Sequence, residues 1–126
     1  MRKVERVDMM PKSLEDLKLY QECRKFIIII YRLSGLLPKE ELYGLVSQIR
    51  RAVVSVLANL VEGYGRQTRK DQLHFYNISL SSFREVECYI IVFYDLEYIS
   101  HEQYVYATKV KDKIGGMLIN FIKSKK

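Results

Sequence analysis

The chain has 126 residues and a formal net charge of +6, and 48% of its residues are hydrophobic. This length allows one domain with a real core and leaves little room for a second, and the hydrophobic content excludes a disordered chain. The longest apolar run, residues 88–94, is far shorter than the roughly 20 residues that cross a bilayer. Residues 1–12 carry scattered charges and lack the apolar segment of a secretory signal. We therefore expect a cytoplasmic protein with no membrane partner.

The first predicted element is a helix that begins at Ser13 and is closed by Gly35. Residues 1–12 are expected to form a loose arm ahead of it, since Ser13 to Asp16 has the spacing of a capping box. The isoleucine run at residues 27–30 has strand propensity, but a capped helical pattern enters it and a glycine ends it. Its expected apolar face comprises Leu17, Tyr20, Ile27 and Tyr31, with Phe26, Ile30 and Leu33 as further candidates.

The stretch from Leu42 to Arg66 is predicted to be the second helix. Apolar residues at alternating spacings of three and four form the seam of a helix bundle: Leu42, Leu45, Val46, Ile49, Val53, Val56 and Leu60. Val54, Leu57 and Val61 widen the apolar arc to roughly 180°, which predicts neighbours on two sides. A break is expected near Gly44, and Gly63 and Gly65 end the helix by offering positive φ. The remaining polar positions are Gln48, Arg50, Arg51, Ser55, Asn59 and Glu62.

A third helix is predicted from Thr68, which has capping-box spacing, to about Leu96. Its expected seam comprises Leu73, Tyr76, Leu80, Phe83, Ile90, Ile91 and Tyr94. Glu87 lies within this seam, and a short turn makes helices two and three antiparallel neighbours, which places Glu87 near the height of Arg50 and Arg51. An unpaired carboxylate there is costly, so we expect Glu87 to pair with one of these arginines. A catalytic carboxylate is the alternative.

Ser100 to Gln103 again has cap spacing and begins a fourth helix. Its expected apolar face comprises Tyr104, Ala107 or Thr108, Ile114, Leu118 and Phe121. The pair Gly115–Gly116 either kinks this helix or lets another backbone approach closely. Four helices with short connections and no competing strand pattern predict an all-α, antiparallel up-down-up-down four-helix bundle over residues 13–122, followed by a frayed basic tail at 123–126.

The excess positive charge gathers in two places. Residues 109–126 contain six lysines and one aspartate, and a second cluster at the predicted turn comprises Arg66, Arg69 and Lys70. Such clusters suit a polyanionic partner, because phosphate neutralisation adds over contacts. A solubilising surface explains them equally well. The candidate nucleic-acid-binding residues are Arg66, Arg69, Lys70, Tyr64, Lys123, Lys125 and Lys126. Tyr64 either stacks on a base or packs its ring at the helix end.

No pattern in the sequence predicts a catalytic, metal or cofactor site. His74 and His101 have no neighbours at metal-ligand spacing. The Gly-Tyr-Gly-Arg turn lacks the lysine and the length of a phosphate-binding loop. Cys23 and Cys88 are far apart in helical patterns, and we expect both to be reduced, buried thiols. The expected protein is not an enzyme and holds no cofactor.

Three stretches of the sequence together resemble a known family. They are LEDLKLYQ from residue 14, LPKEELYGLVSQIRRAVVSV and ANLVEGYGR between residues 37 and 66, and FYNISLSSFREVE from residue 75. The chain resembles the bacterial four helix bundle protein family. That family includes proteins encoded by intervening sequences in large-subunit ribosomal RNA genes and is structurally related to the accessory variability determinants of diversity-generating retroelements. The resemblance runs from about Leu14 to Phe121, and the block at 37–66, with Tyr43–Gly44 inside it, is its most specific part.

The resemblance implies a left-handed bundle that assembles into a homo-oligomeric ring, pentameric in the relatives whose assembly is known. It also implies a basic surface suited to nucleic acid and no established catalytic activity. The chain departs from the family at Leu57, where a small residue or proline is often found. The positions that match the family's recurring polar and glycine residues are Gln48, Arg50, Arg51, Ser55, Asn59, Glu62, Gly63, Arg66, Ser79, Ser82 and Glu87.

Two functional hypotheses follow. The first is a nucleic-acid-associated accessory protein that presents its basic clusters to RNA or DNA, with an enzyme such as a reverse transcriptase as a candidate partner. The second is a protein interaction scaffold whose apolar flank binds sister subunits or another helix; this flank comprises Val54, Leu57, Val61, Ile28 and Ile29. We favour the first because the charge is clustered rather than scattered. The two differ in salt dependence, which is steep only for the first.

Overall fold

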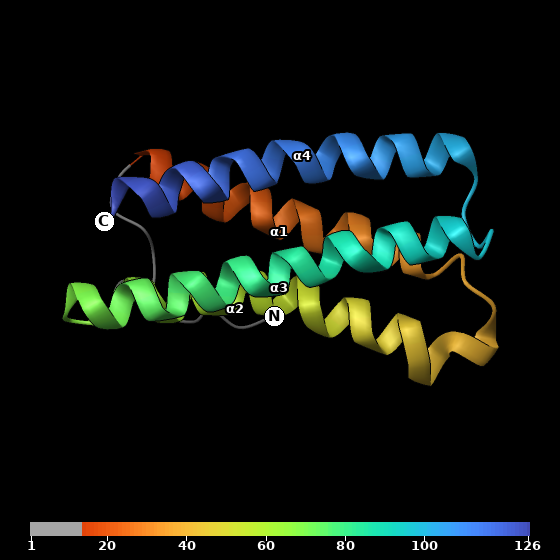
Figure 1. The fold of residues 1–126 in the computed structure, drawn as a ribbon, viewed down its shortest axis with the longest axis horizontal. Coiled ribbons are helices and arrows are strands. Elements are labelled where there is room, and N and C mark those ends of the chain that lie inside the picture. The colour runs from red at the N-terminus through yellow and green to blue at the C-terminus, as the bar shows by residue number, and fades with distance from the viewer. Residues whose placement is uncertain (1–13) are drawn as a thin grey trace, which may run out of the picture.

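The computed structural model describes residues 14–126, and within this range it contains helices and no strand. Four long helices, α1 (Leu14–Ser34), α2 (Ser47–Tyr64), α3 (Arg69–Asp95) and α4 (His101–Ser124), run alternately up and down (Figure 1). Two short segments precede α2: the 3₁₀ turn η2 (Lys39–Glu41) and the π-helical turn η3 (Leu42–Val46). The predicted all-α architecture with four helices is confirmed, while the arm at 1–12 and the cap at Ser13 lie outside the described residues.

The helix ends follow local capping chemistry. The Thr68 side chain accepts a hydrogen bond from the Asp71 backbone N–H at 3.1 Å, so α3 begins where the sequence predicts. Ser100 and Gln103 form the complete capping box at the start of α4. The connections into α3 and α4 are short, whereas the one from α1 to α2 contains η2 and η3. Consecutive helices pack as antiparallel neighbours, and α4 closes the bundle against α1.

On α1 the buried stripe differs from the predicted one. The buried side chains are Leu19, Cys23, Phe26, Ile30 and Leu33. The prediction was wrong for Tyr31, which is exposed, and for Leu17, Tyr20 and Ile27, which are only partly buried. Because four consecutive isoleucines cover every face of the helix, the pattern alone does not fix which stripe turns inward.

On α2 the predicted seam is confirmed from Val46 onward. Val46, Ile49, Val53, Val56 and Leu60 are buried. Leu42 is exposed, contrary to the prediction, because it precedes the expected break, where Gly44 has non-helical angles of φ −110° and ψ −110°. By length and composition alone Lys39–Tyr64 could cross a membrane, a property that the core helices of soluble proteins share. Here its apolar stripe packs in the bundle core.

Two glycine predictions were wrong in their mechanism. Neither Gly63 nor Gly65 has positive φ. Gly63 is buried, and the position needs glycine because a Cβ there would lie 2.7 Å from the Tyr76 ring. In α4, Gly115 neither kinks the helix nor admits another backbone, since a Cβ there would lie 2.8 Å from the ring of Phe83. Both glycines make room for an aromatic ring of α3.

The buried face of α3 contains small polar residues that hydrophobic periodicity did not predict. It comprises Tyr76, Ser79, Ser82, Phe83, Val86, Ile90 and Phe93. Ile91, assigned to the seam by the sequence pattern, is about half exposed, and Leu73, Leu80 and Tyr94 are only partly buried. Cys88 is exposed rather than buried, whereas Cys23 is buried as predicted; both are free thiols.

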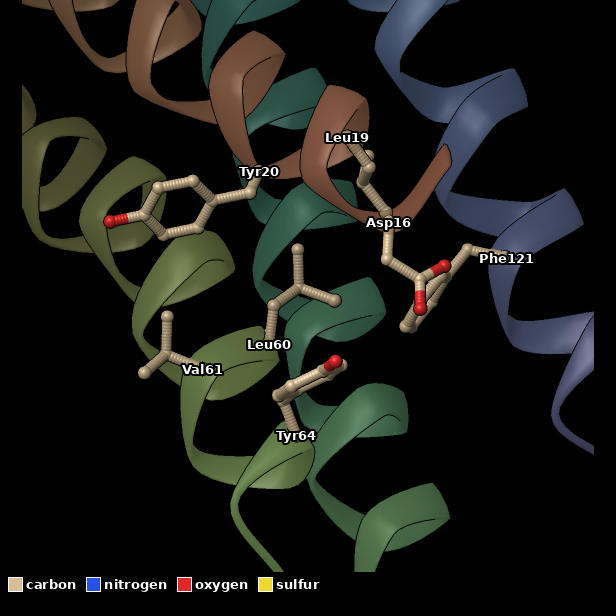
Figure 2. A pocket seen from close by; sticks show the side chains of 7 residues that line it. All are labelled: Asp16, Leu19, Tyr20, Leu60, Val61, Tyr64 and Phe121. Atoms are coloured by element: carbon tan, nitrogen blue, oxygen red, sulfur yellow. The ribbon is translucent and has the colours of Figure 1, made fainter. Parts of the chain in front are cut away.

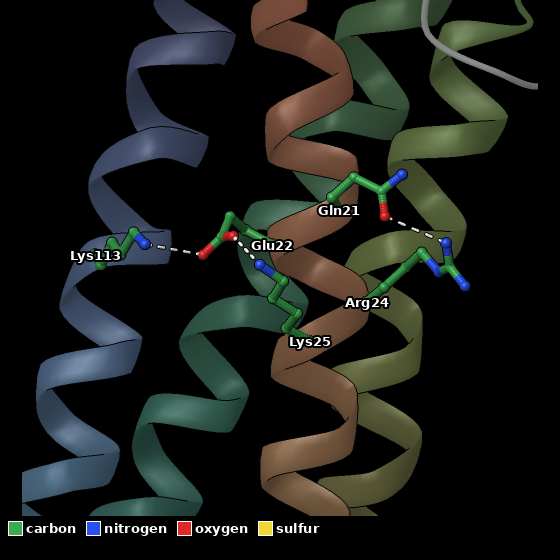
Figure 3. Close-up of polar contacts among 5 residues, drawn as sticks. All are labelled: Gln21, Glu22, Arg24, Lys25 and Lys113. Carbon is green, nitrogen blue, oxygen red and sulfur yellow. Dashed lines mark hydrogen bonds and ion pairs between the residues drawn. The ribbon is translucent and has the colours of Figure 1, made fainter.

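Ion pairs tie α4 to α1 along the outside of the bundle. Glu22 accepts from Lys113 of α4 at 3.0 Å and from Lys25 at 3.1 Å (Figure 3). These contacts lower the pKa of the Glu22 carboxyl below its usual range. The hydrogen bond from Lys113 has the larger effect, and the one from Lys25 the next.

Candidate nucleic-acid interface

The basic turn and the last three lysines of the C-terminal cluster lie at one end of the bundle, whereas Lys111 and Lys113 form ion pairs along its side. The turn between α2 and α3 and the C-terminus of α4 both lie at the left of Figure 1, because the helices alternate in direction. The basic end, as we call it, comprises Arg66, Arg69, Lys70, Lys123, Lys125 and Lys126. The sequence predicted both clusters, and the up-down topology brings the turn and the last three lysines to the same end.

Two members of the basic end are engaged within the chain. Arg66 forms an ion pair with Glu62 at 2.9 Å, and its guanidinium carbon lies 4.6 Å from the centroid of the Phe75 ring. Lys125 pairs with Asp16 at 3.2 Å. These contacts fix the direction of the two side chains and neutralise part of their charge.

The other four cations, Arg69, Lys70, Lys123 and Lys126, are exposed and make no ion pair with any residue between 14 and 126. Arg69 is the first residue of α3, next to the unpaired backbone N–H groups and the positive end of the helix dipole. An anion near this turn would therefore meet side-chain and backbone donors together.

The turn that carries the cluster is closed by a side chain that the sequence analysis missed. Gln72 donates from its amide to the backbone carbonyl of Arg66 at 3.1 Å, across the whole connection. The N–H of Arg66 in turn donates to the carbonyl of Gly63 at 3.1 Å. A glutamine in the first turn of a helix is common, so the sequence held no signal for this contact.

Tyr64 turns toward the interior of the bundle end rather than toward the tip. It lines a cavity of about 20 Å³ between α1, α2 and α4 (Figure 2). Its neighbours around the cavity are Asp16, Leu19, Tyr20, Leu60, Val61 and Phe121. A space of this size holds one water molecule and no larger ligand.

Arg50 closes the C-terminus of α1. Its Nε donates to the buried Ser34 hydroxyl at 2.8 Å and its Nη2 to the carbonyl of Tyr31 at 3.2 Å. The guanidinium carbon also lies 4.6 Å from the centroid of the Tyr31 ring. Arg50 thus adds a charged donor to a carbonyl that already accepts from the Gly35 N–H and the Ser34 hydroxyl, whereas Gln48 and Arg51 are exposed.

Glu87 pairs with neither arginine, so the predicted pairing was wrong. Its carboxylate lies 3.2 Å from the ammonium of Lys111 on α4, which also contacts Asp112 at 2.7 Å. Glu87 lies on the side of α3 that faces α4, whereas Ser79 and Ser82 lie on the side that faces α2. Burial would lower the pKa of Lys111, but its hydrogen bonds to Asp112 and Glu87 raise it overall. The geometry favours a structural ion pair over a catalytic carboxylate.

The polar residues between α2 and α3 satisfy one another. The hydroxyls of Ser55 and Ser82 lie 2.8 Å apart, and the Asn59 amide donates to the Ser55 carbonyl and hydroxyl, both at 2.9 Å. Ser79 donates to the carbonyl of Val56 at 2.6 Å. Their small size lets the two helices pack closely, and their hydrogen-bonding capacity is used in doing so.

No metal-binding arrangement of His, Cys, Asp and Glu side chains occurs between residues 14 and 126. His101 shares a hydrogen bond of 3.1 Å with the hydroxyl of Tyr94, and His74 packs edge-on against Phe75. Both histidines have aromatic neighbours rather than ligand partners. The part of the chain that the structure describes contains no buried side-chain polar atom without a hydrogen bond.

Comparisons with known proteins agree with this architecture. Residues 15–120 match the model of a family described as 23S rRNA-intervening sequence protein. A crystal structure of a protein of unknown function from the S23 ribosomal protein family of Bacteroides thetaiotaomicron is similar, with 29% identity and a TM-score of 0.79. The match covers 87% of this chain and 99% of that protein. No curated protein matches the chain.

Proposed function

The chain belongs to the family of 23S rRNA-intervening sequence proteins, and from this premise we propose that it is a non-enzymatic, cytoplasmic accessory protein that binds RNA or DNA through its basic end. One observation carries the proposal: the basic turn at residues 66–70 and the lysines at 123–126 are far apart in the sequence but lie at the same end of the molecule. Four of their cations are exposed and without an ion pair to any residue of 14–126. Binding by such a surface is driven by release of counterions from phosphates.

The residues of this proposal have different roles. Arg69, Lys70, Lys123 and Lys126 contact phosphates, since their charges are not neutralised within the described chain. Arg66 mainly holds the turn through Glu62 and Phe75. Tyr64 receives no base contact in the proposal, because its ring lines the cavity between the helices.

We also propose that the protein acts as a homo-oligomer, with a pentameric ring as the expected form. Large apolar side chains are exposed on both halves of the bundle: Ile28, Tyr31 and Val54 on α1 and α2, and Ile91, Val105 and Tyr106 on α3 and α4. Two different apolar faces suit a head-to-tail contact, which closes into a ring when the rotation allows it. The scaffold hypothesis uses the same faces without nucleic acid.

The test is binding of labelled structured RNA and duplex DNA at several salt concentrations, with the oligomer mass measured in the same samples. The variant Arg69→Ala/Lys70→Ala/Lys123→Ala should reduce the slope of log K against log salt by about two to three, because each lost phosphate contact removes roughly 0.7–0.9. The matched control, Arg32→Ala/Lys39→Ala/Lys109→Ala, removes three exposed charges elsewhere and should leave the slope nearly unchanged.

Two outcomes would reject nucleic-acid binding at this end. One is absence of binding near physiological salt by an intact oligomer, which leaves the scaffold hypothesis and makes the search for a protein partner the next step. The other is an equal loss of slope in both triple variants, which would mean that overall charge rather than the basic end attracts nucleic acid.

A further inference from the structure

The opposite end of the bundle carries exposed apolar side chains that nothing between residues 14 and 126 covers. Tyr43 is 92% exposed in η3, beside the exposed Leu42, and Leu36 and Leu96 are each about half exposed. Tyr98 donates to the Glu41 carboxylate at 2.8 Å, which joins η2 to the α3–α4 turn. The two connections that carry the four apolar side chains lie at the same end of the bundle, at the right of Figure 1. Apolar side chains gathered at one polar-rimmed surface are typical of interaction sites.

The charge of this end is opposite to that of the whole chain. Residues 31–50 and 92–104 contain five carboxylates, against the basic residues Arg32, Lys39 and Arg50. The chain as a whole has a net charge of +6. The acidic end, as we call it, comprises Leu36, Leu42, Tyr43 and Leu96 with Glu40, Glu41, Asp95, Glu97 and Glu102.

The α3–α4 turn at this end forms an open hollow of about 690 Å³. The residues that line it include Tyr94, Asp95, Glu97, Tyr98 and His101. One face of the Tyr94 ring is stacked on Tyr104, with the centroids 4.3 Å apart, and the other is left for a ligand. Carboxylates beside aromatic faces attract a lysine or arginine side chain by charge and by cation–π contact. The hollow therefore has the chemistry of a site for a basic side chain, next to apolar side chains that need cover.

Glu97 occupies a position where the backbone favours glycine. Its φ is 61°, and it closes α3 in a Schellman arrangement, with its N–H bonded to the Tyr94 carbonyl and the Tyr98 N–H bonded to the Phe93 carbonyl, both at 2.9 Å. A non-glycine residue in this conformation costs stability. The chain nevertheless places a carboxylate-bearing residue there, and this residue lines the hollow.

We propose that the acidic end docks a basic, amphipathic segment of a partner protein, which covers Tyr43 and its apolar neighbours and places a lysine or arginine in the hollow beside Asp95 and Glu97. Charge complementarity selects this occupant, since an acidic segment would be repelled by the five carboxylates. An amphipathic helix with one apolar and one basic face presents both kinds of side chain together. The proposal is independent of nucleic-acid binding, which uses the other end.

The test uses a synthetic 18-residue helical peptide with leucine on one face and lysine and arginine on the other, and an analogue in which glutamate replaces the basic residues. Binding to the full chain is followed by fluorescence anisotropy, and the contact surface is mapped by amide chemical shifts. The basic peptide should shift amides of residues 36–43 and 95–101. Asp95→Asn/Glu97→Gln and Tyr43→Ser should each weaken it at least tenfold.

The matched control is Glu85→Gln/Asp112→Asn, which removes two exposed carboxylates away from this end and should change the affinity by less than twofold. Glu97→Gly should keep the fold and still weaken binding, which separates the carboxylate from the turn geometry. The proposal is overturned by no binding up to about 1 mM, by equal binding of the acidic analogue, or by shifts that map elsewhere. A change in oligomer mass in the acidic-end variants would instead make this end a contact between copies and would also overturn it.

Discussion

Gly63 lies in the last turn of α2, where the absence of a side chain lets the buried ring of Tyr76 pack on the helix backbone. A Cβ at this position would lie 2.7 Å from the ring and 3.0 Å from the carbonyl of Gln72. We predict that Gly63→Ala lowers the free energy of unfolding by about 1–3 kcal/mol, the usual cost of overpacking a core. Urea unfolding followed by circular dichroism measures this difference.

Gly65, two residues later, is the control for that prediction. A Cβ there would meet nothing closer than 3.8 Å, and its φ of −83° suits any residue. Gly65→Ala should therefore be neutral or stabilise the protein by about 0.4–1 kcal/mol through the unfolded chain. Equal destabilisation by the two substitutions would show that the turn needs glycine for another reason.

Arg50 binds the end of α1 through two hydrogen bonds and an aromatic contact. We predict that Arg50→Ala lowers the free energy of unfolding by about 1–3 kcal/mol, because a carbonyl and a buried hydroxyl lose a charged donor. Lysine should restore only part of this, since it lacks the planar fork. Arg51→Ala removes an exposed neighbour without a hydrogen bond to the described residues, and should stay within about 0.5 kcal/mol of the parent. Similar effects at both positions would contradict the capping role.

At the scale of the helix, sequence predicts what is decided locally. The caps at Thr68 and Ser100 depend on residues within one turn, so they set the starts of α3 and α4 correctly. The face of α1 that is buried depends on how the neighbouring helices pack against it. The four consecutive isoleucines make every face of this turn apolar, so the sequence pattern does not identify the buried one. On α3 the inward residues include Ser79, whose partner is a backbone carbonyl of α2, which hydrophobic periodicity does not register.

In the candidate interface, too, the sequence predicts the local features but not those that depend on helix packing. The basic clusters are visible in the sequence, and the placement of the basic turn and the last three lysines at one end follows from four antiparallel helices. The inward direction of Tyr64 and the pairing of Glu87 with Lys111 depend on angular position around each helix. Height along the helix axis does not say which way a side chain of α3 points. Glu87 could face α2 or α4, and its carboxylate faces α4 rather than α2 as predicted.

The link between α1 and α4 through Glu22 makes a prediction about pH. Hydrogen bonds from Lys113 and then Lys25 lower the pKa of Glu22 below its ordinary value of 4.5. A lowered folded pKa gives stability that is present above the ordinary pKa and is lost as the pH falls through the folded pKa. Glu22→Gln should therefore cost about 0.2–1 kcal/mol at pH 7, and the cost should shrink in acid. Urea titrations across this range measure it.

Glu85→Gln is the control, since Glu85 is an exposed glutamate of α3. Its effect on the free energy of unfolding should be small and should not vary across the same pH range. If Glu22→Gln cost as much well below the glutamate pKa as at neutral pH, packing rather than charge would explain the loss.

The two adjacent glycines of α4 should respond in opposite directions. A Cβ at Gly115 would meet the Phe83 ring at 2.8 Å, whereas a Cβ at Gly116 would have no atom within 4 Å. We predict that Gly116→Ala raises the free energy of unfolding of the protein by about 0.5–1 kcal/mol, because alanine favours the helix. Gly115→Ala should lower it. Thermal unfolding of both variants, with the oligomer mass checked, decides this; a destabilising Gly116→Ala would contradict it.

Considered as a whole, the molecule separates its charges along the bundle axis. The basic end gathers six cations, and the acidic end gathers five carboxylates together with exposed apolar side chains. The middle of the bundle satisfies its polar groups internally, at the α2–α3 serines and the Glu87–Lys111 pair. Both proposed binding surfaces thus lie at the ends, where substitutions leave the core intact.

The stability of the whole bundle can be followed from a single buried thiol. Cys23 is 1% exposed in the core, and burial, with a smaller contribution from the nearby Glu22 charge, raises its pKa to about 12. Thiolates are the reactive species, so a thiol reagent should modify Cys23 only when α1 leaves the bundle. In a Cys88→Ser variant, labelling of Cys23 should be at least about 10³-fold slower than in the unfolded chain. The logarithm of its rate should increase with urea concentration with the same slope as the free energy of global unfolding decreases. Fast labelling of a chain that keeps its helical circular dichroism would show that α1 opens locally, and the four helices would then not unfold as one cooperative unit.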